Sequence, residues 1–389
     1  MKQLCTLFTL ILMLSDIYAQ STLPEIIKNN TSTFYYQDHN FSGKGWEEMI
    51  TQIKEHNSVL IGEDHFFNEI PLFVSKITSE IKFDNFFCEL DPYTAKIIEQ
   101  KINHLPEEQS SQYLKEFSNT FSFYALSTEF NLLKNLVLEK TNIIGTDQIA
   151  LTADRLMASK LLEITKNNGA KQIYSDIMKN SEKHYDLFTN GKGNPYFFTD
   201  EFEQNLEKLS NLKLSSEERL ILKDLALSRK IYTSQDHSLR IQLMKNNILN
   251  TIDLLKNKKN LFKYGAIHMN KAESILGGYD IGNLISNIED ANFQSSLHIM
   301  IIGKEGMQGV PFKGMETQKV NPNSKDLKHF GCFFDSIEGD DWHVFNTKEI
   351  VKEIQVNKIK IEDEILLKTV KGFDYLIVIP KVSAATFIN

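Results

Sequence analysis

Short apolar runs that stop at polar residues are the feature that most constrains this chain of 389 residues. They occupy residues 58–61, 85–88, 142–144, 261–264, 297–302 and 375–379. Runs of this length that are apolar at most positions are typical of strands buried on both faces. Segments with helical spacing lie between them, at 70–81, 92–102 and 125–139. This alternation predicts an α/β fold with a mainly parallel central sheet flanked by helices.

The stretch between the third and fourth runs breaks the alternation. Residues 151–257 carry long helical patterns without a convincing strand, and we interpret them as an all-helical insertion. The α/β core then has its first half at 20–150 and its second half at 258–389. We expect the insertion to form a cap over a crevice at the edge of the sheet. Trp342 and His343, next to two aspartates, are interpreted as an exposed loop.

Residues 1–19 resemble a secretory signal peptide. Lys2 precedes an apolar run at 4–14, and Ala19 is a small residue suited to cleavage. The run is shorter than the roughly 20 residues that span a membrane, and no cysteine stands at the cleavage point to carry a lipid. We therefore expect an exported, soluble protein, periplasmic or secreted, with no membrane span or lipid anchor.

Net charge bears on possible binding partners, and cysteine content bears on possible disulfides. The net charge is −8, with 51 acidic and 43 basic residues, which argues against a nucleic-acid partner because phosphate binding needs a concentrated positive surface. Cleavage of the leader would leave Cys88 and Cys332. They permit one disulfide, but Cys88 lies in an apolar run and is typical of a buried small hydrophobe. The oligomeric state stays open.

The motif Gly62-Glu63-Asp64-His65 directly follows the first apolar run. In open α/β sheets ligands bind at the carboxyl ends of the strands. Glu63 and His65 are two residues apart, so an extended backbone projects both to one side, where the carboxylate can orient the imidazole as a base. A turn whose polar residues cap the next helix is the other interpretation of this motif.

Three later runs also end at an ionisable side chain. Glu89, Asp147 and His268 each follow a predicted strand. Each of them alone can be a helix cap or a structural hydrogen-bonding group. Together they match the expectation that a parallel sheet brings its functional side chains to one edge.

These motifs resemble the erythromycin esterase-like family, within a broader group that includes ChaN-like haem-uptake and TraB/Tiki proteins. The single residue between Glu63 and His65 resembles the ChaN-like spacing. The resemblance runs from about residue 45 to 300. It rests, in order, on Gly62-Glu63-Asp64-His65 with Glu69, on Glu89, on Gly145-Thr146-Asp147, on Arg240, Met244 and Asn247 of one helix, on Gly265-Ala266-Ile267-His268, and on Gly282-Asn283-Leu284.

The resemblance implies an exported hydrolase that acts on an ester or related bond of a small-molecule substrate. It implies His65 as a general base that activates water, held by Glu63 or Glu89, with Arg240 and His268 stabilising the oxyanion. It also implies substrate-binding roles for Glu69, Asp147 and Asn247. The Gly-x-Ser-x-Gly motif of common esterases is absent, so water must be the nucleophile.

Two alternatives remain open at this stage. Glu63, His65, Glu89 and His268 are ligand types suited to a divalent metal, as in a TraB/Tiki-like peptidase, but no His-Glu-x-x-His or paired cysteine motif supports one. We predict no cofactor and no metal. The other alternative is a ChaN-like protein that binds haem or another hydrophobic ligand without turnover.

Overall fold

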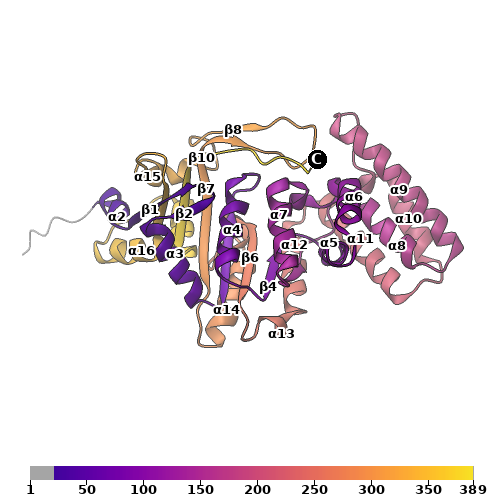
Figure 1. Cartoon of the computed structure of the whole chain (residues 1–389), viewed down its shortest axis with the longest axis horizontal. Helices are drawn as coiled ribbons and strands as arrows, with labels where there is room; N and C mark the ends of the chain where they lie inside the picture. Colours follow the sequence, from indigo (N-terminus) through magenta and orange to yellow (C-terminus); the bar gives the residue numbers. More distant parts are fainter. Residues whose placement is uncertain (1–21, 389) are drawn as a thin grey trace, which may run out of the picture.

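The computed structural model describes residues 22–388, so the predicted signal peptide lies outside the described residues. Ten strands form one sheet in the order β2-β1-β9-β10-β7-β3-β6-β4-β5, and β8 pairs with β7 (Figure 1). The strands are β1 (Thr31–Gln37), β2 (Asn40–Ser42), β3 (Ser58–Glu63), β4 (Asn85–Cys88), β5 (Asn142–Gly145), β6 (Asn260–Gly265), β7 (Leu297–Gln308), β8 (Gln318–Val320), β9 (Trp342–Asn346) and β10 (Tyr375–Val382).

Neighbouring strands from β10 to β5 all pair in parallel, which confirms the predicted α/β class. Strand β6 lies between β3 and β4, although it follows both of them in the sequence. The strand order therefore reverses near β3 and β6. In open α/β sheets the crevice beyond the carboxyl ends of such strands is the usual ligand site.

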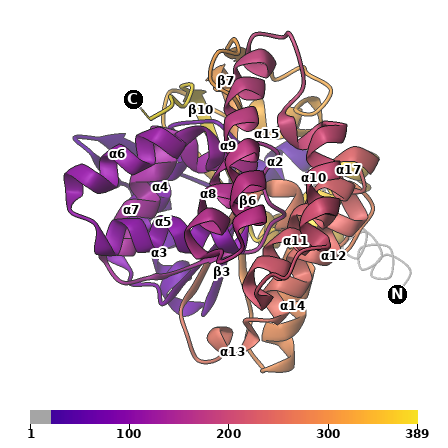
Figure 2. The same ribbon diagram turned by 90° about the vertical axis from the view of Figure 1, so that its right-hand side faces the viewer.

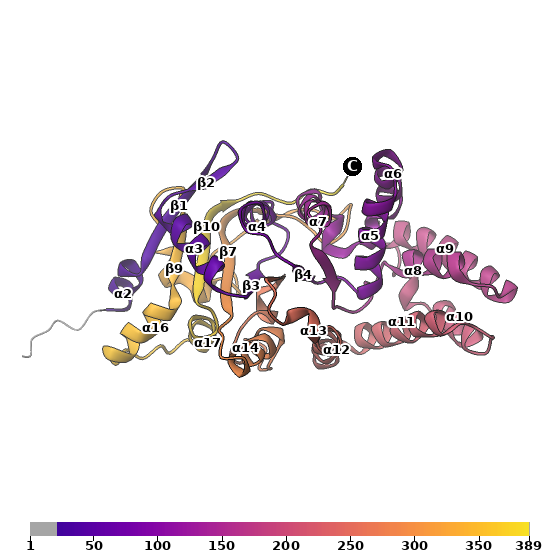
Figure 3. The same ribbon diagram turned by 60° about the horizontal axis from the view of Figure 1, so that its bottom comes forward.

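Helices cover both faces of the parallel strands because successive strand side chains point to opposite sides. In β3, Val59 and Ile61 belong to one buried apolar cluster and Leu60 belongs to the other. Figure 3 shows the two helical layers. The first consists of α3 (Lys44–Glu55), α4 (Glu69–Glu80), α5 (Pro92–His104) and α7 (Ser127–Leu138), and the second of α2 (Leu23–Asn29), α12 (His237–Leu249), α14 (Ile281–Ala291), α16 (Thr347–Val356) and α17 (Glu364–Gly372).

One edge of the sheet is antiparallel. Strand β9 pairs antiparallel with both β10 and β1, and β2 continues the edge. The interpretation of Trp342 and His343 as an exposed loop is therefore wrong, because both are buried in β9. Trp342 packs against Phe34 of β1, with ring centroids 5.2 Å apart, so its apolar surface is buried between the edge strands and α4.

Residues 151–257 contain helices and loops without a strand, as expected. They do not form a cap over the carboxyl edge of the sheet. Figure 1 shows α8–α11 beyond α5, at one end of the molecule, and Figure 2 views the molecule from that end. Their apolar side chains, Leu156 and Phe202 among them, extend the core cluster that contains α5. The helices are α8 (Asp154–Ile164), α9 (Asn168–Thr189), α10 (Asp200–Ser210), α11 (Ser216–Ser234), α12 and α13 (Ile252–Leu255).

The structure also bears on the expected absence of a membrane span and on the state of the two cysteines. Within residues 22–388, no helix is both long and apolar enough to cross a membrane. Cys88 and Cys332 are both free thiols, and Cys88 is completely buried in the core. Burial raises the pKa of Cys88 to about 12, so this thiol stays protonated at neutral pH.

We expect Asp154→Asn to change how stability depends on pH. Asp154 is 2% exposed, accepts a hydrogen bond from Ser181 and has its other oxygen unpartnered. Burial raises its pKa to about 7, so the folded state holds this proton more tightly than the unfolded state. Its ionisation therefore destabilises the fold as pH rises from about 4 towards 7.

The Tm of the variant relative to wild type should be higher at pH 8 than at pH 5 in thermal melts followed by circular dichroism. Asp176→Asn, which changes an exposed carboxylate on α9, serves as the control and should show no such trend. A Tm difference for Asp154→Asn that does not vary with pH would contradict the prediction.

Candidate active site

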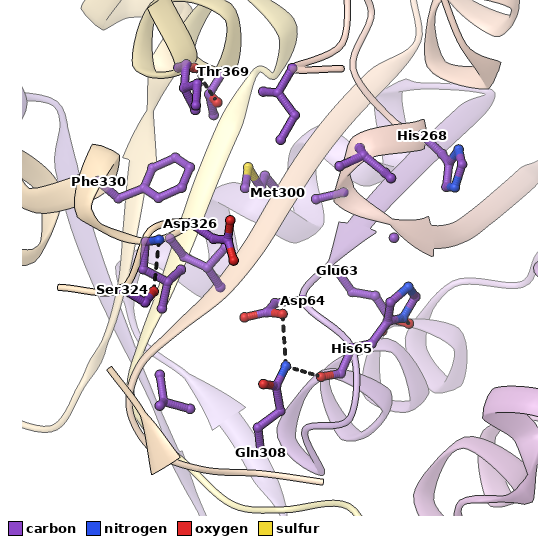
Figure 4. Close-up of a pocket in the computed structure, with 18 of the residues that line it drawn as sticks. Glu63, Asp64, His65, His268, Met300, Gln308, Ser324, Asp326, Phe330 and Thr369 are labelled. Carbon is purple, nitrogen blue, oxygen red and sulfur yellow. Dashed lines mark hydrogen bonds and ion pairs between the residues drawn. The ribbon is translucent and has the colours of Figure 1, made fainter. Parts of the chain in front are cut away.

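A cavity of about 660 Å³ opens at the carboxyl ends of β3, β4 and β6 (Figure 4). Of residues 151–257, only Arg240 lines it, so the expectation that this region roofs the crevice is wrong. The chain from β8 to α17 borders the cavity instead. The polar end is lined by Glu63, Asp64, His65, Glu89, Arg240 and His268, and the apolar wall includes Phe123, Ile275, Met300, Ile302, Leu327, Phe330 and Phe373.

His65 lies between two carboxylates. Its Nδ1 is 2.8 Å from Glu63 Oε1, and its Nε2 is 3.4 Å from Glu89 Oε2. The imidazole stacks on Phe123 with ring centroids 4.1 Å apart. On another side, a Cβ at Gly265 would lie only 2.7 Å from Nε2, so the glycine at the end of β6 leaves room for the ring. These contacts fix the orientation of His65 before any substrate binds.

Glu89 connects the two histidines of the site. Oε2 accepts a hydrogen bond from the Gly265 amide at 2.7 Å, besides facing His65. Oε1 accepts a hydrogen bond from Arg240 Nη2 at 2.9 Å and lies 3.6 Å from His268 Nε2. The carboxylate is 4% exposed, so it exchanges water for contacts with four groups of the protein.

Arg240 is held mainly by Asp147. Its Nε and Nη2 donate to the two oxygens of Asp147 at 2.9 and 2.6 Å, a bidentate pair. With Nη2 also donating to Glu89, the remaining nitrogen is Nη1, which lies 3.4 Å from His268 Nε2. Asp147 therefore acts by positioning Arg240, and it does not line the cavity.

His268 has a carboxylate partner that the motifs did not identify. Asp280 Oδ2 lies 2.8 Å from His268 Nδ1, and both side chains are 1% exposed. Asp280 is the N-cap of α14 and also accepts a hydrogen bond from the Ile281 amide. In the sequence, the position of Asp280 before a helix indicates only an N-cap. Its separation of 12 residues from His268 matches no helix or strand repeat that would place the two side chains together.

A buried lysine supports Glu63. Lys263 of β6 is 3% exposed, and its Nζ lies 2.6 Å from both Glu63 Oε2 and Glu129 Oε1. Glu129 comes from α7, and its Oε2 has no hydrogen-bond partner. The sequence signal for these partners was Lys263 itself, because a lysine within a buried strand needs acidic side chains next to its ammonium group.

Two predicted substrate-binding residues lie away from the cavity. Glu69 begins α4, and its carboxylate accepts hydrogen bonds from the amide and hydroxyl of Ser383. Asn247 Nδ2 donates to the carbonyl of Thr146 at 2.8 Å and so links α12 to the end of β5. Neither residue lines the cavity.

The contact of Glu69 belongs to a strap formed by residues 383–388. Phe67 bridges Ala384, and Leu126 bridges Phe387, both in antiparallel geometry. Asn68 Nδ2 also donates to the carbonyl of Ala384. The strap thus joins the turn that follows His65 to the segment that follows Phe123.

Neighbouring charges shift the pKa values of His65, Glu89 and Glu63. Burial alone would lower the pKa of His65, but Glu89 and Glu63 outweigh it and raise the pKa above the ordinary value. Burial opposes ionisation of Glu89, yet His65, His268 and Arg240 lower its pKa to about 2. Despite its burial, Glu63 likewise has a lowered pKa, because Lys263 and His65 favour its charged form.

Asp64 behaves differently from its neighbours. Burial raises its pKa to about 6, and it accepts a hydrogen bond from Gln308 Nε2 at 3.2 Å. Figure 4 shows Asp64 and Asp326 on the side of the cavity that also holds Met300 and Phe330. Asp64 therefore lines the same part of the cavity as these two apolar residues.

The four residues considered for a divalent metal fit one poorly. Lys263 lies 2.6 Å from Glu63, and Arg240 lies 2.9 Å from Glu89, so each carboxylate already has a cation. His65 is bound to Glu63 through Nδ1 and faces Glu89 through Nε2. A metal ion among them would have to displace these contacts and lie close to two positive charges.

Comparisons with solved structures identify the class of fold. A histidine-to-asparagine mutant of the erythromycin esterase EreC, in its open conformation, is 14% identical, with a TM-score of 0.57 over 92% of this chain and 99% of that chain. A succinoglycan biosynthesis protein is 16% identical, with a TM-score of 0.56 over 95% of this chain and 99% of that one.

A Bacillus cereus protein is 15% identical, with a TM-score of 0.56 over 96% of this chain and 100% of that one. ChaN of Campylobacter jejuni, in a structure with cofacial haem, reaches a TM-score of only 0.29, too low to indicate a shared fold. No protein-family model and no curated protein matches the sequence. The chain therefore has the fold of the erythromycin esterase structure, at an identity that identifies the fold alone.

Loss of Lys263 should destabilise the protein. We expect Lys263→Met to lower the free energy of unfolding by about 3–5 kcal/mol, because it leaves the buried Glu129 without a cation and Glu63 with His65 as its remaining partner. Adding Glu129→Gln should recover part of this loss, since one of the two is then neutral. Urea unfolding at pH 8 is measured for wild type, the two single variants Lys263→Met and Glu129→Gln, and the double variant. A double variant whose loss equals the sum of the two single losses would contradict the prediction.

Proposed function

We propose that this protein is a hydrolase that cleaves an ester or related bond of a small molecule with water activated by His65. The observation that carries the proposal is the clamped imidazole. One ring nitrogen is bound to Glu63, and the other lies beside Glu89 in a cavity with an apolar wall. The fold shared with an erythromycin esterase structure supports the same class of reaction.

In this mechanism His65 Nε2 takes a proton from water as the water oxygen attacks the carbonyl carbon. Glu63 keeps the proton on Nδ1, so Nε2 has the free lone pair in the neutral ring. The imidazolium that forms is stabilised by Glu63 and Glu89 on its two sides. It then returns the proton to the leaving oxygen as the tetrahedral intermediate collapses.

Arg240 through Nη1, and His268 through Nε2 when its ring is protonated, are the donors we propose for the oxyanion. The Nη1 of Arg240 is the guanidinium nitrogen that no carboxylate takes up, and both side chains line the cavity beside Glu89. Asp147 and Asp280 hold these two donors at fixed positions, which reduces the reorganisation needed as charge develops.

We further propose that the substrate carries an apolar group, because Met300, Phe330 and Phe373 line the cavity. Asp64 and Asp326 would contact its polar substituents. The signal-like segment at 1–19 supports export, and we propose that the enzyme acts outside the cytoplasm.

We expect His65→Ala to reduce ester hydrolysis by at least ~10²-fold, since a positioned base typically contributes about 10²–10⁴. The variant should still be folded at the assay temperature by circular dichroism, because the ring lines the cavity rather than the apolar core. The assay is a panel of aryl and alkyl esters with apolar acyl groups. His104→Ala, at the exposed end of α5, is the matched control and should keep full activity.

Two outcomes would favour other functions. If EDTA abolishes turnover and Zn²⁺ or Mn²⁺ restores it, a metal rather than His65 activates water. If no ester is cleaved and added haem gives a Soret band that depends on His65, a ligand-binding protein is the better interpretation. Full turnover by His65→Ala would also refute the proposed mechanism.

The pH profile of Glu63→Gln tests the role of the clamp. The Glu63 carboxylate helps to raise the pKa of His65, so wild-type kcat/KM should rise with pH through this raised pKa. Replacing the carboxylate by an amide removes that stabilisation of the imidazolium. The acidic limb should therefore move to lower pH, and the maximal rate should fall less than in His65→Ala. A limb that stays in place or moves to higher pH would exclude this role for Glu63.

A further inference from the structure

A second group of ligand-type side chains lies behind the cavity. His237, His268 and Asp280 each offer one ligand atom, and these atoms lie within 4.8 Å of one another. They come from three separate elements, namely the first turn of α12, the 3₁₀ turn after β6 and the N-cap of α14. His237 does not line the cavity, so this group reaches away from the substrate side.

The group contains unused bonding capacity. His237 Nε2 is a buried ring nitrogen with no hydrogen-bond partner, although the side chain as a whole is only partly buried. Asp280 is 1% exposed, and the only ion pair found for it among the described residues is with His268. The unpartnered ring nitrogen of His237, next to a second imidazole and a buried carboxylate, is unexplained by packing alone.

The local charges permit a cation at this position. The nearby guanidinium of Arg240 is matched by Asp147 and Glu89 at 2.6 and 2.9 Å. Asp280 therefore remains as an additional negative charge beside the two imidazoles. Two histidines and one carboxylate are a common ligand set for zinc, with a water molecule in the fourth position.

We propose that His237, His268 and Asp280 bind a divalent transition-metal ion, with zinc as the best match, and that the bound ion inhibits the enzyme. Binding engages His268, which the proposed reaction needs as an oxyanion donor, and places positive charge beside Arg240. The inhibition rests on the proposed hydrolase function, whereas metal binding does not.

Cobalt provides a direct test of the site. Metal-free full-length protein titrated with Co²⁺ should develop visible d–d absorption that saturates at one equivalent, and Zn²⁺ should displace the Co²⁺. His237→Ala should weaken Co²⁺ binding by more than the ~10–100-fold typical for loss of an outer-shell partner. Asp280→Asn should weaken it as well. His329→Ala removes a histidine that pairs with Asp363 elsewhere and should bind Co²⁺ like wild type.

Activity then tests the inhibition. One equivalent of Zn²⁺ should suppress ester hydrolysis by wild type, whereas His237→Ala should keep its metal-free rate in the presence and absence of the ion. Failure of wild type to bind Co²⁺, or binding that His237→Ala leaves unchanged, would overturn the site. Zinc bound to a fully active wild type would overturn the inhibition. If no ester is cleaved at all, the proposed function fails, and the cobalt titration still decides the site.

Discussion

The carboxylate of Glu89 is the group on which the whole site depends. It is buried at the end of β4, where an isolated negative charge would be strongly unfavourable. The backbone amide of Gly265 and the side chains of His65, His268 and Arg240 compensate for the lost water. Because these partners come from the turn after β3, from β6, from the turn after β6 and from α12, a single charge determines how four segments meet.

Two further charged groups, Lys263 and Arg240, each connect a carboxylate of the site to a carboxylate outside the cavity. Lys263 joins Glu63 to Glu129 on one helical layer, while Arg240 joins Glu89 to Asp147 from the other. Both cations are held in place by two carboxylates, so neither end of the site relies on a single contact. The helices on both faces of the sheet therefore contribute to the orientation of His65 and His268 as well as to the core.

The sequence predicted the parallel sheet, because each buried strand is recognisable from its own apolar run. It also predicted that the residues at the strand ends meet, because the carboxyl ends of parallel strands lie at one edge of the sheet. It failed where a residue acts through a distant partner. Asp280 and Glu129 looked like an ordinary cap and an ordinary helix residue, since only the folded chain brings them to His268 and Lys263. The region at 151–257 was recognised as helical, but helical spacing does not specify the surface on which helices pack. The edge strand β9 was missed because its pairing is with distant β1.

The strap at 383–388 has a consequence for how the protein folds. Its contacts with Asn68 span 315 residues of sequence, so they are among the most non-local in the chain. Contacts of such separation form only when much of the loop between them is already ordered. The contacts that hold the turn after His65 therefore carry a loop-closure cost that is offset only when the strands between them have paired. Fraying of residues 383–388 would release this turn, so the orientation of His65 is coupled to the stability of a segment that does not line the cavity.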